Sequence, residues 1–156
     1  MAYLIRRATI ADMEIIIRQR RSMFEEMGTG TTESLDRMIA AYYPWLSEKL
    51  ETGGYVGFLA VDGDTVIAGA GAIISDMRQP HPVLRDGKTA HVVNVYTESD
   101  YRKQGLARRL MQTLVEYFRE EGIGSATLHA SQFGRSLYES LGFEDTPEMI
   151  LDLNKL

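Results

Sequence analysis

The sequence contains no cysteine, only four prolines and a single tryptophan among its 156 residues. Without cysteine, the chain can form no disulfide, no thiolate nucleophile and no cysteine-ligated metal site. No apolar run approaches the roughly 20 residues that a membrane-spanning helix needs, and the stretch M-A-Y-L-I-R-R-A-T lacks the apolar core of a signal peptide. We therefore expect a cytoplasmic protein with no membrane partner, and the sequence indicates no metal site.

The charge balance of the chain is acidic. It carries 22 Asp and Glu against 17 Lys and Arg, for a net charge of -5. This balance argues against general nucleic-acid binding and favours cationic partners. Hydrophobic residues make up 44% and charged residues 25% of the chain, as in ordinary globular proteins. The length fits a single domain over residues 1–156.

Hydrophobic periodicity predicts a mixture of helices and strands. Strands are expected over residues 3–7, 55–61, 65–75, 91–97 and 126–130, and from residue 143 onward, where Met149, Leu151 and Leu153 alternate. Helices are expected over residues 9–27, 35–50, 106–121 and about 133–141. Pro44 lies inside the second helical pattern, so we expect it to kink that helix or to split it. The last alternating stretch is expected to close the sheet.

The stretch Ala-Gly-Ala-Gly-Ala at residues 68–72 is rich in small residues, as nucleotide-binding loops are. However, no helix start follows it, and such a loop needs one. Small residues inside a strand mark a place where another group packs closely against the backbone. We therefore assign this stretch to a strand, in a hairpin whose turn is Asp62-Gly63-Asp64.

Residues 101–107 read Tyr-Arg-Lys-Gln-Gly-Leu-Ala and lie between an expected strand and an expected helix. The first turn of a helix leaves backbone N–H groups unpaired and carries a partial positive charge, which suits a pyrophosphate. Gly105 would let the backbone approach such an anion closely. Four cations surround the turn, namely Arg102, Lys103, Arg108 and Arg109. An ordinary solvated turn is the alternative interpretation of this stretch taken alone.

Two stretches of sequence carry a resemblance to a known family. One is V-Y-T-E-S-D-Y-R-K-Q-G-L-A (Val95 to Ala107), and the other is L-Y-E-S-L-G-F (Leu137 to Phe143). Together with the order of elements, they resemble the GCN5-related N-acetyltransferase (GNAT) family, whose R/Q-x-x-G-x-G/A motif matches residues 102–107. Two positions depart from the family pattern. Ser131 stands where asparagine is common, and Ser99 stands where a proline commonly precedes the Tyr-Arg pair.

The resemblance implies an α/β fold (α+β in some schemes) with a mixed, mostly antiparallel sheet of about seven strands and about four flanking helices. It also implies direct transfer of an acetyl group from acetyl-CoA, with CoA as product, to a primary amine of a small molecule or a peptide. A homodimer is compatible with it. The implied cofactor-binding residues are Val95, Tyr96, Thr97, Arg102, Lys103, Gln104, Gly105, Leu106, Ala107, Arg108, Ser131 and Tyr138.

The resemblance also implies catalytic roles. The backbone N–H of Val95 would donate to the thioester oxygen as negative charge builds there, and Thr97 would pair with the pantetheine amides. Tyr138, with an ordinary pKa of about 10 against about 8.5 for a thiol, would protonate the leaving thiolate as a general acid. Plain core packing is the alternative interpretation of Tyr138.

His91 is the candidate for the base that deprotonates the amine. It lies four residues before Val95 and hence on the same face of a regular strand. Asn94 would point to the opposite face unless a bulge intervenes. A structural or surface role is the alternative for His91, and surface positions are expected for His81 and His129.

Two other functions compete with catalysis. A non-catalytic acyl-CoA-binding sensor would share the fold, and a turnover assay separates it from an enzyme. A nucleotide-binding or kinase-like module is the second alternative. The sequence lacks a G-x-x-x-x-G-K-[ST] loop, and no G-x-G-x-x-G lies at a strand-to-helix turn, which weighs against that second class.

Overall fold

The fold is arranged around one sheet of five strands in the order β1-β2-β3-β4-β5. The computed structural model describes residues 3–76, 79–84 and 87–156. The strands are β1 (Leu4–Arg7), β2 (Tyr55–Asp62), β3 (Thr65–Ser75), β4 (Thr89–Thr97) and β5 (Ser125–Leu128). The helices are α1 (Met13–Met27), α2 (Thr32–Thr52), α3 (Leu106–Glu120) and α4 (Arg135–Ser140), with 3-10 turns at Ile10–Asp12, Ser99–Tyr101 and Leu153–Lys155.

The sheet is mixed and mostly antiparallel, as expected. Neighbouring strands from β1 to β4 pair antiparallel, and β5 pairs parallel to β4. The hairpin of β2 and β3 has Asp62 opposite Thr65, in agreement with the predicted Asp-Gly turn. The connection from β4 to β5 passes through α3, which is the crossover that a parallel pair requires.

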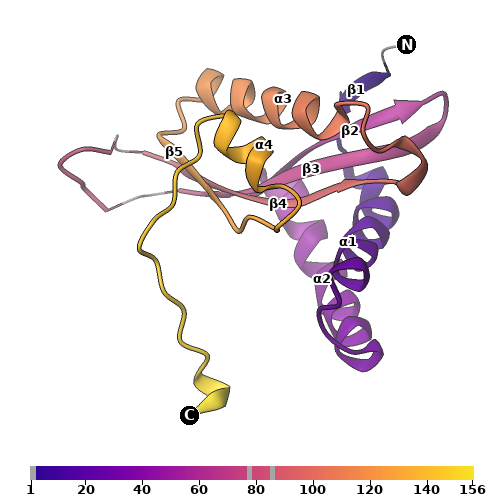
Figure 1. Cartoon of the computed structure of the whole chain (residues 1–156), viewed down its shortest axis with the longest axis horizontal. Helices are drawn as coiled ribbons and strands as arrows, with labels where there is room; N and C mark the ends of the chain where they lie inside the picture. The colour runs from indigo at the N-terminus through magenta and orange to yellow at the C-terminus, as the bar shows by residue number, and fades with distance from the viewer. Residues whose placement is uncertain (1–2, 77–78, 85–86) are drawn as a thin grey trace.

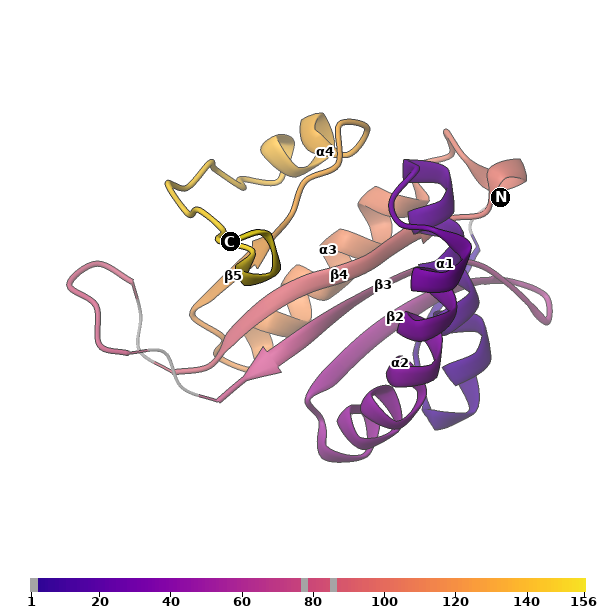
Figure 2. The ribbon, with the colours of Figure 1, turned by 90° about the horizontal axis from the view of Figure 1, so that it is seen from below.

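The helices cover the two faces of this sheet (Figures 1 and 2). α3 lies on one face, where Leu110, Met111 and Leu114 are fully buried against small residues of the central strands. α1 and α2 lie together on the opposite face, where Leu46 is fully buried beside Tyr55. Within the described ranges, no helix is both long enough and apolar enough to cross a bilayer.

Local sequence sets where the first two helices begin and end. Asp12 accepts a hydrogen bond from the backbone N–H of Thr9 (2.8 Å) and pairs with Arg6 (2.9 Å), which fixes the entry into α1. Gly28 ends α1 in a left-handed conformation with φ of 68°. α2 continues through Pro44 as one helix, so of the two expected outcomes, a kink or a split, the split is wrong. The helix beyond the proline stays in place because one of its faces is buried against the sheet.

The small residues of β3 leave room for side chains on the α1/α2 face. A Cβ on Gly71 would lie 2.1 Å from the hydroxyl oxygen of Tyr55, and one on Gly69 would lie 2.9 Å from Oε1 of Gln19. Both distances are shorter than real Cβ contacts, so a larger residue at either position would have to displace the neighbouring side chain. The prediction of a strand with close packing is therefore confirmed.

Among the described residues the sheet has five strands, where the resemblance implies about seven, and the end of the chain does not join it. Residues 143–152 form neither helix nor strand. Met149, Leu151 and Leu153, whose alternation predicts a closing strand, are 92%, 67% and 72% exposed. A strand needs a neighbour to pair with, and Figure 1 shows this segment running away from the sheet.

Candidate active site

The middle of β4 carries a bulge at Asn94. The register pairs on either side of it are Val93 with Gly71 and Tyr96 with Gly69. Two residues of β4 therefore face a single residue of β3. Asn94 has φ of 58°, in the left-handed region that asparagine tolerates better than most residues.

Side chains from three other elements hold this bulge. The Asn94 side chain is 6% exposed, and its Oδ1 accepts from Nη1 of Arg20 in α1 at 2.8 Å. Its amide nitrogen donates to the hydroxyls of Tyr42 in α2 and Tyr55 in β2, each at 3.1 Å. Burial raises the pKa of Tyr55, so its hydroxyl stays protonated. The network therefore fixes the irregular backbone of β4 from the α1/α2 face.

The bulge changes which face of the sheet each β4 side chain occupies. Val92 and Val95 both pack in the cluster beneath α3, whereas Val93 packs with α1 and α2. In a regular strand, Val92 and Val95 would lie on opposite faces. His91 precedes Val92 and therefore lies on the face away from the Val95 side chain. The expectation that His91 and Val95 share a face is wrong, because the bulge shifts the alternation by one residue.

β4 and β5 separate close to this bulge. Their parallel pairing extends only as far as Val92 opposite Leu128. Residues 93–97 have β3 on one side and, within the part of the chain that is described, no strand on the other. The predicted cofactor contacts on this strand lie along the open edge: Val95, Tyr96 and Thr97. An extended ligand can pair with such an edge through main-chain hydrogen bonds.

The turn from β4 into α3 has the geometry of an anion site. Lys103 and Gly105 have φ of 63° and 78°, and Gly105 is the N-cap of α3. The backbone N–H of Arg109 donates to the carbonyl of Gly105 (3.1 Å), so the N–H groups of residues 106–108 precede the first hydrogen-bonded turn. A Cβ on Gly105 would meet no atom within 4 Å, so the surface over the turn is open.

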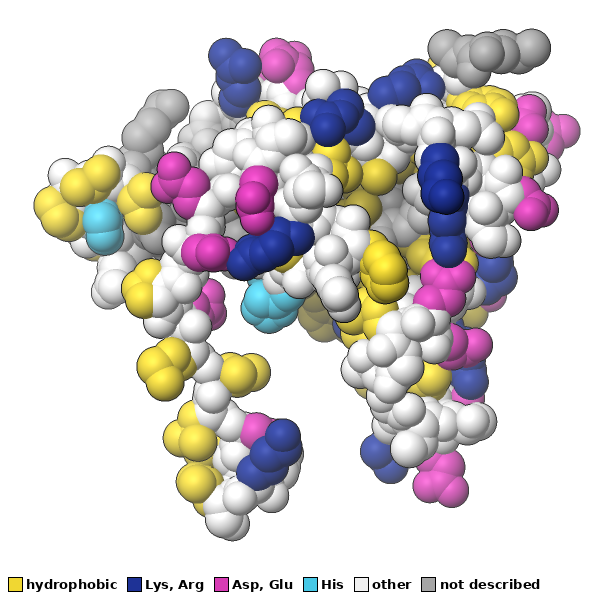
Figure 3. All heavy atoms as spheres, viewed as in Figure 1, with side chains coloured by type: hydrophobic (Ala, Val, Ile, Leu, Met, Phe, Trp, Pro, Cys, Tyr) yellow, Lys and Arg dark blue, Asp and Glu magenta, His cyan; other side chains and the backbone are white. Residues whose placement is uncertain are grey.

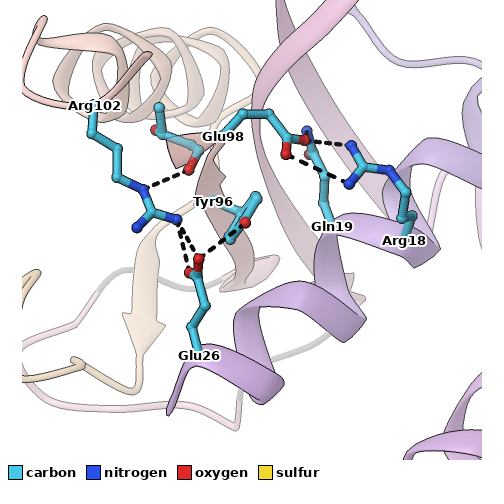
Figure 4. A network of polar contacts seen from close by, with 7 residues as sticks. Arg18, Gln19, Glu26, Tyr96, Glu98 and Arg102 are labelled. Carbon is cyan, nitrogen blue, oxygen red and sulfur yellow. Dashed lines mark hydrogen bonds and ion pairs between the residues drawn. The ribbon is translucent and has the colours of Figure 1, made fainter. Parts of the chain in front are cut away.

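Arg102 does not point freely into this turn. Its guanidinium donates to both carboxylate oxygens of Glu26, near the end of α1, at 2.8 Å, and its Nε donates to the carbonyl of Thr97 at 2.9 Å (Figure 4). The hydrogen bonds with Glu26 raise the pKa of Arg102. The Tyr96 hydroxyl donates to the same carboxylate at 3.3 Å. These contacts tie α1 to the strand that carries the predicted cofactor contacts.

A second ion pair joins α1 to the residue that follows β4. Figure 4 shows the side chains of Arg18 and Gln19 approaching the carboxylate of Glu98 from the α1 side. Arg18 forms a salt bridge with Glu98, and Nε2 of Gln19 donates to it at 3.2 Å. Both carboxylates in this view are therefore paired with arginine, and α1 is fastened to β4 at two places.

The remaining cations of the turn have different surroundings. Arg109 donates to the carbonyl of Tyr3, beside β1, at 2.8 Å. The prediction that Arg109 surrounds the anion site is therefore wrong, because its side chain is engaged at the other end of the sheet. Arg108 donates to Oγ of Ser140 in α4 at 3.0 Å, and Lys103 is exposed.

Tyr138 lies in α4 and packs beneath α3, with 8% of its surface exposed. Its ring meets Phe143 edge to face at 6.0 Å, and a Cβ on Gly134 would lie 2.7 Å from its Cε2. Burial raises the pKa of Tyr138, so the hydroxyl is protonated at neutral pH. No described residue hydrogen-bonds this hydroxyl, which is nevertheless not sealed from solvent. The ring is packed in the core while the hydroxyl keeps its donor available.

Ser131 begins the turn that leads into α4. Its Oγ accepts from the backbone N–H of Gly134 at 3.2 Å, and its carbonyl accepts from the N–H groups of Gly134 and Arg135 at 3.1 Å. The side chain therefore caps its own turn. Its predicted contact with the pantetheine arm stays a prediction.

His91 bridges β4 and β5. Its Nδ1 lies 2.7 Å from Oγ1 of Thr127, and its ring lies edge-on to His129 with centroids 5.1 Å apart. Partial burial and the neighbouring His129 lower the pKa of His91, while the charge of Glu148 acts in the opposite direction. His91 is therefore neutral near pH 7, which is the form a base needs.

Sequence reasoning missed the residues that hold the site together. Arg20 and Glu26 carry no motif, and each acts on a partner 74 or 76 residues away in the chain. Asn94 could have been singled out, because an asparagine inside an otherwise apolar strand is a signal of a bulge or a left-handed residue.

The geometry agrees with the known proteins that this chain is similar to. Residues 18–143 match the model of the acetyltransferase (GNAT) family. The chain is 29% identical to human N-acetyltransferase 8 over 105 residues, which is 65% of this chain and 42% of that protein. A second human relative, N-acetyltransferase 8B, is 29% identical over 92 residues. The chain spans about two fifths of the length of these curated relatives.

Two solved structures resemble the whole chain. A GCN5-related N-acetyltransferase from Ralstonia eutropha JMP134 is 32% identical with a TM-score of 0.90, covering 98% of this chain and 99% of that one. A predicted acetyltransferase with acetyl-CoA from Clostridium acetobutylicum is 27% identical with a TM-score of 0.85, covering 98% and 97%.

Proposed function

The chain belongs to the acetyltransferase (GNAT) family, and we propose that it is an acetyl-CoA-dependent N-acetyltransferase acting directly on a primary amine of a small molecule or a peptide. The observation that carries this proposal is the line of open backbone from the Asn94 bulge along β4 to the first turn of α3. Acetyl-CoA needs donors at its thioester oxygen, its pantetheine amides and its pyrophosphate, in that order. The open backbone of β4 and the first turn of α3 are proposed to supply donors in the same order.

The turn before α3 is the proposed pyrophosphate site. The N–H groups of residues 106–108 and the positive end of the helix favour an anion. Gly105 supports this role because it adopts a positive φ and leaves the surface open. Lys103 and Arg108 add positive charge, whereas Arg102 shapes the strand exit through its bond to the Thr97 carbonyl.

The chemistry is proposed to proceed as an addition and an elimination. The amine nitrogen attacks the thioester carbon, the N–C bond forms, and negative charge builds on the carbonyl oxygen, where the N–H of Val95 donates. The C–S bond then breaks, and the thiolate takes the proton of the Tyr138 hydroxyl. The nitrogen releases its second proton to solvent and the tyrosinate regains one from solvent, so that the products are the neutral amide and the free CoA thiol. The raised pKa of Tyr138 supports the acid role, because the hydroxyl enters the reaction protonated.

The amine must lose a proton before it attacks, and we assign this step to His91 acting directly or through water. Its lowered pKa supports a neutral imidazole at pH 7. Because the bulge places His91 on the α1/α2 face, the acceptor is proposed to approach from that face. The imidazole takes up the proton and then releases it to solvent, since the histidine is only partly buried.

The test is a turnover assay with acetyl-CoA and a panel of primary amines, in which the release of free CoA thiol and the mass of the acetylated product are both measured. Thiol release that depends on the amine supports the proposal. Saturable binding of acetyl-CoA without turnover on any amine would instead favour the acyl-CoA-binding sensor. The variant Tyr138→Phe serves as the control for catalysis that does not come from the proposed site.

A further inference from the structure

Arg20 differs from the other two arginines of α1, because no described carboxylate pairs with it. Arg18 forms a salt bridge with Glu98, and Arg21 forms two, with acidic residues of α1 and α2. Figure 3 shows acidic and basic side chains lying next to one another over α1 and α2, at the lower right of the view. Arg20 is partly buried, where an unbalanced charge costs more than on the open surface. It therefore brings a positive charge that the described part of the chain does not neutralise.

Aromatic and sulfur contacts hold the Arg20 guanidinium in place. Its central carbon lies 4.8 Å from the centre of the Phe24 ring and 4.5 Å from the centre of the Tyr42 ring. Its Nε donates to the sulfur of Met38 at 3.3 Å, and a thioether is a weak acceptor. Nη1 donates to Asn94, while Nη2 donates to no residue that the structure describes. The cation is thus fixed in position with part of its donor capacity unused.

Arg20 also sets the direction of each hydrogen bond around Asn94. A guanidinium can only donate, so the Asn94 atom that faces it is the carbonyl oxygen. The amide nitrogen then faces the hydroxyls of Tyr42 and Tyr55, and since it can only donate, both hydroxyl oxygens accept. No described residue accepts the proton of either hydroxyl. This group of side chains therefore holds more donors than acceptors.

Building on the transferase function proposed above, we propose that Arg20 and Tyr42 bind a carboxylate of the acceptor, which is an amine that carries a carboxylate, as free amino acids do. Both side chains are partly exposed, whereas Tyr55 is buried, so these two donors are the ones that a ligand can reach. Both bond the side chain of Asn94, and the next residue is Val95, whose N–H is the proposed donor to the thioester oxygen. The two donors lie on the α1/α2 face, from which the acceptor is proposed to approach.

The charge of the site favours a carboxylate over a phosphate. A carboxylate carries one negative charge, which one guanidinium balances, and its two oxygens can accept from Arg20 and from the Tyr42 hydroxyl. A phosphate monoester carries more than one negative charge near pH 7, and the excess would be unbalanced in a chain whose net charge is -5. Glu26 and Glu98 are paired with other arginines, so neither competes for Arg20.

The first test compares acceptors that differ only in the carboxylate. The common amino acids and their primary amides are assayed as pairs with acetyl-CoA, and kcat/KM is expressed per concentration of unprotonated amine. For the accepted amino acids, we expect the acid to exceed its amide by roughly 10- to 100-fold, the range for hydrogen bonds to a charged group. Equal rates within every pair would overturn the proposal. Phosphoethanolamine accepted in preference to β-alanine, which has the same two-carbon spacing, would also overturn it.

The second test assigns this preference to Arg20. Arg20→Gln removes the charge but keeps an N–H that can donate to Asn94, and it should abolish the preference for the acid over the amide. Arg21→Gln is the matched control, because it removes a charge from the same helix that Glu25 and Asp36 already neutralise, and the preference should stay unchanged. A lower rate in Arg20→Gln with the preference intact would assign Arg20 to holding the bulge and overturn the proposal.

Tyr42→Phe is a second variant that leaves the charge of Arg20 in place. It keeps the ring beside the guanidinium and removes only the hydroxyl, so the preference for the acid should fall by a smaller factor, roughly 3- to 10-fold. If Arg20→Gln does not fold, Tyr42→Phe still decides, since an unchanged preference in this variant would remove the hydroxyl from the proposed site.

A binding measurement separates failure of the carboxylate site from failure of the transferase function. Calorimetry follows each amino acid and its amide as it is titrated into the protein saturated with CoA, which has no acetyl group to transfer. Binding of the acid that Arg20→Gln weakens by roughly tenfold or more, without turnover on any amine, would keep the carboxylate site and reject the transferase. Turnover with no preference for acids would keep the transferase and reject the site, and the absence of both binding and turnover would reject both.

Discussion

The opening where β4 and β5 separate has two unlike walls. One is β4 with the side chains that hold it, and the other is α4 with the turn that precedes it. On the β4 wall, the side chain of Asn94 makes three hydrogen bonds, and Arg102 and Glu98 are each fixed by α1. On the α4 wall, Ser131 bonds only its own turn, and Tyr138 is held by packing, with no partner for its hydroxyl among the described residues. One wall is fixed by polar contacts from distant elements, and the other by apolar contacts from its neighbours.

This difference separates two tasks that a transferase site must perform. The open backbone of β4 can orient a ligand only if it does not move, so its polar contacts are directed at holding the strand. A group that gives up a proton must keep its donor free, so the Tyr138 hydroxyl cannot be committed to another residue. Substitutions on the β4 wall should therefore act on stability and binding, and those on the α4 wall on the rate of chemistry.

The largest effect is expected at Asn94. Asn94→Ala removes three hydrogen bonds and leaves a residue with a Cβ at φ of 58°, so the free energy of unfolding should fall by about 3 kcal/mol. Ser131→Ala on the other wall removes one part-buried hydrogen bond within a turn and should cost about 1 kcal/mol or less. Urea denaturation measures both, and equal losses would remove the contrast between the walls.

Asn94→Gly divides the Asn94 effect into its two causes. Glycine adopts the positive φ without strain but lacks the side-chain hydrogen bonds. The loss of stability should therefore be smaller than for alanine by roughly 1 kcal/mol, which is the cost of a left-handed residue with a Cβ.

Tyr138→Phe is expected to change the rate and not the binding. The ring and its packing stay, and only the proton donor is lost. We expect kcat to fall by roughly 100-fold with little change in the affinity for acetyl-CoA, the pattern of an interaction made in the transition state. Single-turnover measurements check that chemistry limits the rate. An unchanged kcat under those conditions would assign Tyr138 to packing alone.

Gly105→Asp is expected to act on binding. The new carboxylate lies where the pyrophosphate is proposed to bind, so acetyl-CoA affinity should fall by well over tenfold, or about 1.4 kcal/mol and more. Gly105→Ala is the matched control, because it keeps the positive-φ strain but adds no charge and meets no atom within 4 Å. Calorimetry should show a clearly smaller loss for alanine, and equal losses would point to strain instead of charge.

The sequence predicts those parts of the two walls that depend on local patterns. α3 was predictable because Leu106, Leu110 and Leu114 repeat at helical spacing, and Gly105 marks its start. The bulge in β4 was not predictable from local patterns, since the hydrogen-bond partners of Asn94 lie 39, 52 and 74 residues away in the chain. The predicted closing strand from residue 143 onward is wrong because apolar side chains can alternate along a segment that has no neighbouring strand to pair with. Local periodicity gives the elements, while contacts between distant elements decide their irregularities.

The smallest effect concerns His91, which joins β4 to β5 through Thr127. If it is the base, kcat/KM should rise with pH through an apparent pKa below the ordinary value of about 6.5, because burial and His129 lower the pKa of His91. His91→Ala should abolish this limb. His129→Ala is the informative control, since it removes the neighbouring side chain that lowers the pKa of His91 and should move the limb to higher pH without removing it.

The same lowered pKa makes the folded protein less stable in mild acid. The unfolded chain binds a proton at His91 more readily than the folded one, so the free energy of unfolding falls as the pH drops below about 6.5. His91→Ala should reduce this acid sensitivity, measured as the change in urea midpoint between neutral and mildly acidic buffer. If the kinetic limb persists in His91→Ala while this stability effect is lost, His91 titrates in the folded protein but is not the base. The group that titrates in the kinetics would then be the ammonium of the acceptor or a carboxylate, and His91 would serve to hold β4 against β5.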